Sequence, residues 1–375
     1  MAGTRPIDVA RLRLVAQEVH KPTADGPLGA VSHLTAMQGQ DLLGVLWSIG
    51  LRTPGATEAD VRSAFDRREL VRSWPMRGTL HVSTPDDLRL ILPLSRHRLE
   101  TTFATRRRDL GIDARDVVDA TDAALANLQG RPMVRKELFA AFESAGQSTS
   151  GQRGAHLIGA IAHAGLICLG PFVGREQAFV LLDEWAPAGR EIPPRDDALD
   201  EVALRYFLGH GPATVADLAW WANLTLTDVR AAIARVEDRL ATLTVGTTTY
   251  YASPELAGHA STVPGARSVH LLPGFDENLL GYTDRSAALA VAHSPLIVPG
   301  NNGMFKSTIV VGGRVVGTWS RAEKPKSIQL TAHQFGELGS SARSALSGAA
   351  RRYGRFKGKA AELAFAPMGE GSPTL

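Results

Sequence analysis

The chain has 375 residues, of which 44% are hydrophobic and 21% are charged, so it has the length and apolar content for two or three globular domains. We expect neither a membrane-spanning helix nor an export signal, because no run of about 18 apolar residues occurs and no basic-then-apolar segment opens the chain. The net charge is +3, and most of the 41 basic residues are arginines, an excess typical of a GC-rich genome. The single cysteine, Cys168, fits a reducing compartment, so we expect a soluble cytoplasmic protein.

The first part of the chain predicts helices separated by a loop. Apolar residues recur with helical spacing over residues 7–20 and again over 34–51, and a Pro/Gly-rich loop at 21–31 lies between them. Thr57 is followed by acidic residues, a pattern typical of an N-cap, and predicts a helix that continues over 61–68.

The run from Leu70 to Val82 predicts two short strands joined by a turn at residues 76–78. Helix, helix, strand, strand is the order of the winged helix, a variant of the helix-turn-helix. Thr84, followed by Pro85 and two acidic residues, predicts the start of the next helix.

Two later stretches repeat this order, which predicts three tandem units of one kind. The second unit is predicted to contain helices 133–145 and 151–165 and strands 166–170 and 178–182. The third is predicted to contain helices ending at 211, opening at 212 and spanning 225–235, and strands 240–245 and 248–252. Pro-rich or polar linkers are predicted at 186–195 and 261–267.

The last part of the chain predicts mainly strands. Residues 310–316 predict a hairpin with Gly312 and Gly313 at its turn, and a basic helix over 332–353 is expected to close the chain. The predicted fold class is therefore α+β, with tandem winged-helix domains and a β-rich C-terminal part. The predicted domains are 1–115 (N-terminal helix and first winged helix), 116–190 (second winged helix), 196–258 (third winged helix) and 265–375 (C-terminal domain).

The common catalytic motifs do not occur in a suitable context. We find no HExxH, CxxC, P-loop, GxSxG or dinucleotide fingerprint, and we therefore expect neither a metal nor a cofactor.

Two glutamines one residue apart, Gln38 and Gln40, precede an apolar segment. On a helix, residues i and i+2 point about 200° apart, so we expect the two amides to converge at a helix N-terminus or in an irregular turn, where Gly39 permits it. Asp41 is either an assisting carboxylate or, as we favour, a residue of the first helical turn. An isolated Gln-x-Gln is ordinarily interpreted as two glutamines on a solvent-exposed surface.

Polar residues alternate with apolar ones in the predicted 70–82 hairpin, and a polar side of this kind suits contact with a DNA backbone or minor groove. Trp74 either stacks on a base or fills a core, and His81 either orients a phosphate or water or is a satisfied structural histidine. The residues expected to contact DNA are Arg72, Trp74, Arg77, Thr79 and His81, together with Arg321, Lys324, Arg351 and Arg352 from the basic C-terminal part.

Asp276, Glu277 and Asn278 form a polar turn in the C-terminal part. Carboxylates that face DNA are unusual unless they are paired, so we favour a turn cap that pairs with an arginine.

These segments together resemble the AlkZ/YcaQ-type winged-helix DNA glycosylases, a family that removes alkylated purines from DNA. The second glutamine resembles the AlkZ-like branch, because the YcaQ-like branch has an aspartate there. By this resemblance Gln38 and Gln40 are catalytic, and three winged helices surround a concave basic channel. The motifs that carry the resemblance extend along nearly the whole chain: Met37–Asp41, Arg77–His81, Gly211–Thr214, Leu271–Asn278 with Arg285, and Val316–Trp319.

The resemblance implies a monofunctional DNA glycosylase. Neutral glutamines suit a leaving group that is already cationic, because the remaining task is to place water against an oxocarbenium-like sugar. We therefore expect hydrolysis of N7-alkylguanine or N3-alkyladenine, including bulky or crosslinked adducts, in double-stranded DNA. The protein is expected to act as a monomer and to associate with the nucleoid when bound to DNA. Relatives in the family include self-resistance enzymes of antibiotic producers. The alternative is a winged-helix DNA-binding protein or transcriptional regulator without chemistry.

Overall fold

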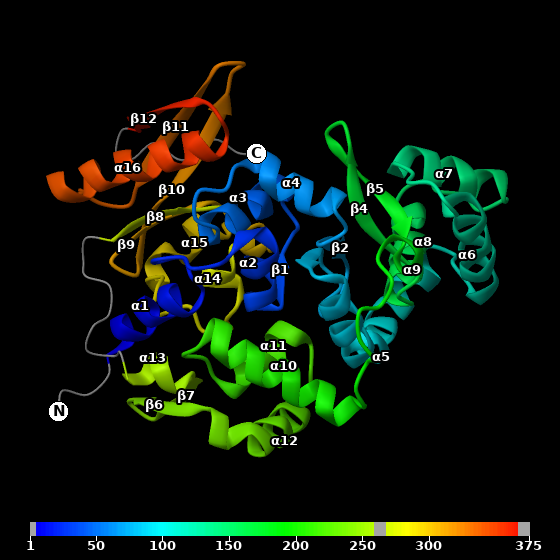
Figure 1. Ribbon diagram of the computed structural model, residues 1–375, viewed down its shortest axis with the longest axis horizontal. Helices are drawn as coiled ribbons and strands as arrows, with labels where there is room; N and C mark the ends of the chain where they lie inside the picture. Colours follow the sequence, from blue (N-terminus) through cyan, green and yellow to red (C-terminus); the bar gives the residue numbers. More distant parts are fainter. Residues whose placement is uncertain (1–4, 259–267, 367–375) are drawn as a thin grey trace.

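The computed structural model describes residues 5–258 and 268–366, which form a mixed α+β protein (Figure 1). The predicted linker at 261–267 lies outside the described residues. Among the residues described, no helix combines the length and apolar character needed to cross a membrane. The first elements are α1 (Pro6–Ala16), α2 (Gly26–Leu34), β1 (Ala36–Gln38), α3 (Leu42–Arg52), α4 (Glu58–Asp66), β2 (Val71–Ser73) and β3 (His81–Ser83).

Two expectations for this first part are wrong. The loop predicted at 21–31 contains the start of α2, because Gly26 and Pro27 open that helix, and proline is well tolerated in a first helical turn. The helix predicted over 34–51 begins only at Leu42. Thr35 ends α2 with a φ of 67°, and the next residues pair with β3 as a strand. The predicted caps Thr57 and Thr84 are confirmed, since each hydroxyl accepts a hydrogen bond from a backbone N–H of its helix.

The first and second predicted units share one sheet. Its strand order is β1-β3-β2-β4-β5, and Arg72 of β2 pairs with Leu169 of β4. The long helix α5 links the two units and ends in the arginine-rich stretch 106–108. The elements of this part are α5 (Pro85–Asp109), α6 (Ala114–Leu128), α7 (Arg135–Ser144), α8 (Arg153–His163), β4 (Ile167–Val173), β5 (Glu176–Leu181) and α9 (Leu182–Trp185).

The third segment has the predicted order of helices followed by a hairpin. Its elements are α10 (Arg195–His210), α11 (Val215–Ala222), α12 (Leu226–Val236), the short 3-10 helix Glu237–Arg239, β6 (Ala241–Val245), β7 (Thr248–Ala252) and α13 (Pro254–Gly258). β6 and β7 form a separate two-stranded sheet, and Tyr251 of β7 also forms an antiparallel bridge with Ala213.

The C-terminal part is a sheet of order β12-β11-β10-β9-β8 packed against α16. The hairpin around Gly312 and Gly313 is confirmed, whereas the closing helix begins at Ser340 rather than at 332 because Ser327–Gln334 is a strand. The elements are β8 (Val269–Leu272), α14 (Glu277–Leu280), the 3-10 helices Val291–His293 and Pro299–Asn301, α15 (Ser294–Ile297), β9 (Thr308–Val311), β10 (Arg314–Glu323), β11 (Ser327–Gln334), α16 (Ser340–Phe356) and β12 (Ala360–Phe365).

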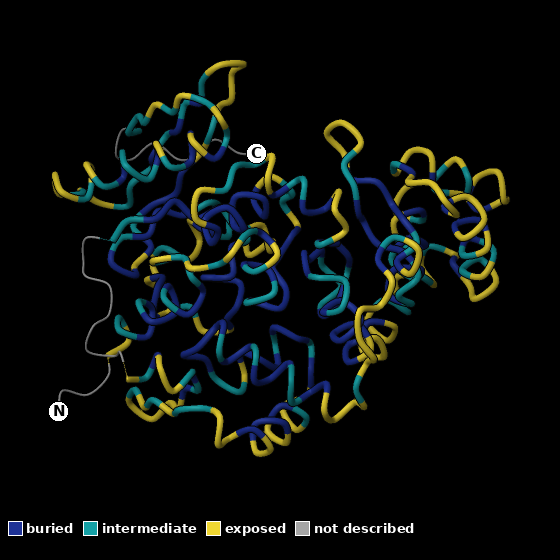
Figure 2. Tube along the Cα trace, viewed as in Figure 1, coloured by how far each residue is buried: buried dark blue, intermediate teal, exposed yellow. Residues whose placement is uncertain are grey.

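The largest hydrophobic core joins the two ends of the chain. Trp47 of α3 packs 5.0 Å, ring centroid to centroid, from Tyr353 of α16, and Trp319 of β10 lies 5.3 Å from the same tyrosine. The buried residues gather where the N-terminal helices meet the C-terminal sheet (Figure 2). This packing brings α14 next to β1, the strand that ends in the glutamine motif.

Candidate active site

The glutamine motif stands at the end of a strand. Gln38 is the last residue of β1 and pairs in register with His81 of β3, and the N–H of Gly39 donates to Leu80 O at 2.7 Å. Gly39 and Gln40 then form an irregular segment between the strand and the start of α3, as the second of the two alternatives expected. Asp41 is the N-cap residue of α3, in keeping with the favoured interpretation.

Both amides reach the same short segment of the hairpin. Thr79 Oγ1 donates to Gln38 Oε1 at 3.3 Å, and the backbone N–H of Leu80 donates to Gln40 Oε1 at 3.4 Å. The Gln38 side chain is buried, with 6% of its surface exposed, whereas Gln40 is exposed to solvent. The pair therefore has an inner amide and an outer amide beside one backbone segment.

Arg72 fixes the residue between the glutamines. Its Nε donates to Gly39 O at 2.8 Å, and its Nη1 donates to Gln177 Oε1 at 3.1 Å. Burial lowers the pKa of Arg72 to about 10, so the guanidinium remains charged at neutral pH. Since only 7% of the residue is exposed, Arg72 acts on the motif from inside the protein.

Glu277 holds the motif from the other side. Its Oε1 accepts the backbone N–H of Gln38 at 2.7 Å, and its Oε2 accepts Trp221 Nε1–H at 3.0 Å and His210 Nε2–H at 3.3 Å. Burial raises the pKa of Glu277, but the hydrogen bond and charge interaction with His210, the charge interaction with His81 and the hydrogen bond from Gln38 outweigh burial and bring this pKa to about 2. Burial also lowers the pKa of His210, which favours its neutral form. The site therefore contains a buried carboxylate whose surroundings favour the ionised form.

His81 lies across from Gln38 and is fully buried. Its Nδ1 is 2.8 Å from Thr79 O, which makes Nδ1 the protonated nitrogen. Its Nε2 has no hydrogen-bond partner within the described part of the chain. Burial and the nearby Arg77 lower the pKa of His81 to about 4, so the ring is neutral at pH 7.

The remaining hairpin residues hold this segment against its neighbours. Trp74 is half-buried and its ring lies parallel to that of Phe179 at 6.3 Å between centroids, a contact in keeping with the core-filling alternative. Arg77 donates to the carbonyl oxygens of Trp220 and Trp221, and its guanidinium lies 4.1 Å from the centroid of the Trp220 ring. The expectation of a polar side that faces solvent is wrong for the buried Arg72 and His81, because those side chains point into the protein.

The four C-terminal candidates lie on the β10–β11 hairpin and on α16. Arg321 is half-buried near the end of β10, Lys324 is exposed at the turn, and Arg351 is exposed on α16. Arg352 is half-buried and donates to Leu51 O. The structure does not bring these residues into contact with the glutamine pair.

Asp276 is a turn cap that pairs with an arginine, which is the alternative favoured from the sequence. It accepts from the backbone N–H of Asn278 at 3.0 Å and from two guanidinium nitrogens of Arg52 at 3.0 and 3.1 Å. The neighbouring Glu277 differs, because it contacts the glutamine motif. Sequence reasoning found the acidic turn but did not connect it with Gln38, which lies 239 residues earlier.

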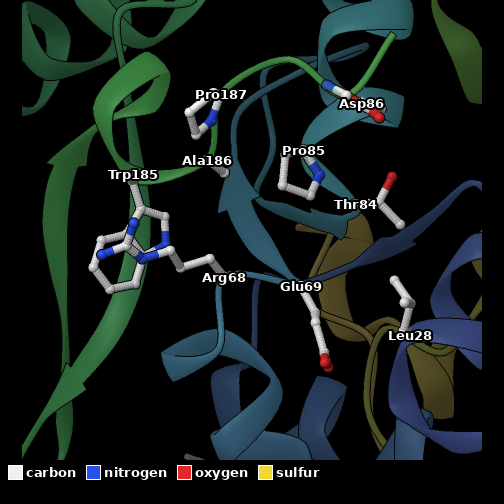
Figure 3. Close-up of a pocket in the computed structure, with 10 residues that line it drawn as sticks. Leu28, Arg68, Glu69, Thr84, Pro85, Asp86, Trp185, Ala186 and Pro187 are labelled. Carbon is white, nitrogen blue, oxygen red and sulfur yellow. The ribbon is translucent and has the colours of Figure 1, made fainter.

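A cavity of about 370 Å³ lies apart from the motif, between the start of α5 and the segment that follows α9 (Figure 3). Arg68 covers the Trp185 ring there, at 4.7 Å from its centroid. None of the residues that line it belongs to Gln38–Gln40. Within residues 5–258 and 268–366, no group of three or more His, Cys, Asp and Glu side chains is arranged to hold a metal ion.

Comparison with known proteins identifies the family of the chain. A family model described as "DNA glycosylase AlkZ-like" matches residues 31–356. The chain belongs to the AlkZ-like DNA glycosylase family. It is therefore an enzyme that acts on the N-glycosyl bonds of DNA, as the resemblance of its motifs predicted.

A relative and a solved structure, both from Streptomyces sahachiroi, are similar to most of the chain. An "Interstrand DNA cross-link repair glycosylase" is 24% identical over 320 residues, covering 82% of this chain and 85% of the relative. The solved structure of DNA glycosylase AlkZ has a TM-score of 0.80 and 23% identity, covering 97% of this chain and all of that one. The structural likeness confirms the mixed α+β fold.

The geometry of Gly39 predicts that this position tolerates a side chain. Its φ lies outside the left-handed region, and a Cβ would lie 3.4 Å from Arg72 Nε and from Val82. We expect Gly39→Ala to leave the free energy of unfolding unchanged or to raise it by up to about 1 kcal/mol, as measured by urea denaturation. Gly78→Ala is the matched control, because Gly78 has a φ of +75° and a Cβ there would lie 2.5 Å from Phe103. Equal destabilisation by the two substitutions would contradict this description of Gly39.

Proposed function

We propose that this glycosylase hydrolyses the N-glycosidic bond of cationic alkylated purines, such as N7-alkylguanine and N3-alkyladenine, in duplex DNA. The observation that carries the proposal is the pair of amides, Gln38 and Gln40, held side by side against Thr79 and Leu80. Such a pair offers oxygens that hold water and face a developing positive charge, but it offers no acid to protonate a neutral base. The name of the cross-link repair relative supports bulky or crosslinked adducts as further substrates.

In the proposed reaction, the bond between C1′ and the purine nitrogen breaks and its electron pair leaves with the already cationic purine. Water, oriented by the amide oxygens, forms the new bond to C1′ and releases its proton to solvent. The products are the free base and an abasic site. We propose a monofunctional reaction, because the side chains recorded as contacting Gln38–Gln40 in the described residues include no lysine that would form a Schiff base.

We further propose that the three helix-and-hairpin segments are winged helices and that a single copy of the chain binds the duplex. The exposed Lys324 and Arg351 are the strongest candidates for phosphate contacts, with Arg321 beside them. Arg72 and His81 are buried and are therefore assigned to the inner frame of the site. Thr79 is half-buried and contacts Gln38, so it lies between this frame and the DNA.

The direct test uses a duplex with a single N7-methylguanine, scored by release of the base and by alkaline cleavage at the abasic site. We expect the wild-type protein to release the base, and Gln38→Ala and Gln40→Ala each to lower the single-turnover rate by about 100-fold or more. Gln129→Ala, an exposed glutamine after α6, is the matched control and should retain the wild-type rate. Binding to the adducted duplex without release of any base would rule out this substrate.

The pKa values of the site predict a flat pH profile. His81, with a pKa of about 4, stays neutral and Glu277, with a pKa of about 2, stays ionised from about pH 5.5 to 8. We therefore expect the single-turnover rate to change by less than about twofold across this window. A rate that falls with an apparent pKa of about 6 to 7 would instead indicate a titrating general base.

A further inference from the structure

We infer that Glu277 is a fixed buried anion that positions Gln38 and makes the site prefer a positive charge above the glutamine pair. The inference deepens the proposed function, because it identifies the group in this chain that would favour cationic adducts and a cationic transition state. Glu277 is a positioning residue, since it is buried beneath the motif and acts through Gln38 and through its charge.

The hydrogen-bond partners of Glu277 include no permanent cation. Its three hydrogen-bond donors are a backbone N–H, an indole N–H and the imidazole N–H of His210. No Lys or Arg nitrogen of the described residues is recorded within 4.0 Å of it. Arg77 interacts electrostatically with Glu277, but its Nη1 donates to the carbonyl oxygens of Trp220 and Trp221 rather than to the carboxylate.

Other buried carboxylates in this protein are paired. Asp276 lies 3.0 Å from a guanidinium nitrogen of Arg52, and Asp217 lies 3.6 Å from one of Arg13. An ionised carboxylate buried without a cation is costly, because it loses hydration without gaining a full ion pair. We therefore expect the cation that pairs with Glu277 to come from the bound DNA.

The position of Glu277 suits that role. Its carboxylate is bonded to the backbone of Gln38, whose side chain faces the segment Thr79–Leu80 next to Gln40. Electrostatic interactions act strongly where water is excluded, so the negative potential extends to the place where the sugar would lie. An oxocarbenium-like sugar or a cationic purine is stabilised there, whereas a neutral base gains nothing.

A binding experiment separates this role from a structural one. One duplex carries a pyrrolidine abasic-site analogue, whose ring nitrogen is protonated, and the other carries the neutral tetrahydrofuran analogue. We expect the wild-type protein to bind the cationic duplex about tenfold more tightly, or better. Glu277→Gln removes the charge but keeps the size and one acceptor, and should bring the ratio of the two dissociation constants close to one.

Asp276→Asn is the matched control, because it removes a buried charge from the neighbouring residue without touching Gln38, and it should retain the preference. If Glu277→Gln does not fold, the ratio of dissociation constants measured for the wild-type protein still tests the inference. A wild-type ratio near one, or a preference that survives loss of the Glu277 charge, overturns the inference. Excision of N7-methylguanine is measured in parallel. A protein that does not excise this base is thereby distinguished from one that excises it but shows no preference for the cationic duplex.

Discussion

The hydrogen bond from the Gln38 N–H to Glu277 joins two distant parts of the chain at the glutamine motif. Gln38 ends a strand of the N-terminal sheet, and Glu277 opens a short helix beside the C-terminal strands, 239 residues later. The bond is possible only because the N-terminal helices and the C-terminal sheet bury one common core. The position of the inner amide therefore depends on the whole fold, and a change that separates the two ends of the chain would disturb the site without touching it.

Several arginines of this protein hold the site together from inside instead of facing DNA. Arg72 holds the carbonyl of Gly39, Arg52 holds Asp276, and both are buried. Each guanidinium satisfies several acceptors at once with a rigid set of donors, which suits the inside of a site. The basic residues that remain for phosphate are those on exposed elements, such as Lys324 and Arg351. A count of basic residues is thus a poor measure of the DNA-binding surface.

Local signals in the sequence predicted the local structure well. The caps at Thr57 and Thr84 were found because a capping side chain bonds to a backbone only three residues away. The strand β1 was missed because its three residues are defined by pairing with β3, which no local pattern records. The same reason explains why the sequence alone predicts a helix over 34–51 and does not link Glu277 to the glutamines. The motif itself was recognised from its sequence, whereas the buried frame of Arg72, His81 and Glu277 required the fold.

The most direct test of this account is a crystal structure of the protein bound to a duplex with the pyrrolidine abasic-site analogue. We expect the ring nitrogen to lie within about 4 Å of an amide oxygen of Gln38 or Gln40, with the analogue against Thr79 and Leu80. An analogue bound at another face, such as the cavity beside Arg68 and Trp185, would contradict the assignment of the glutamine pair as the active site.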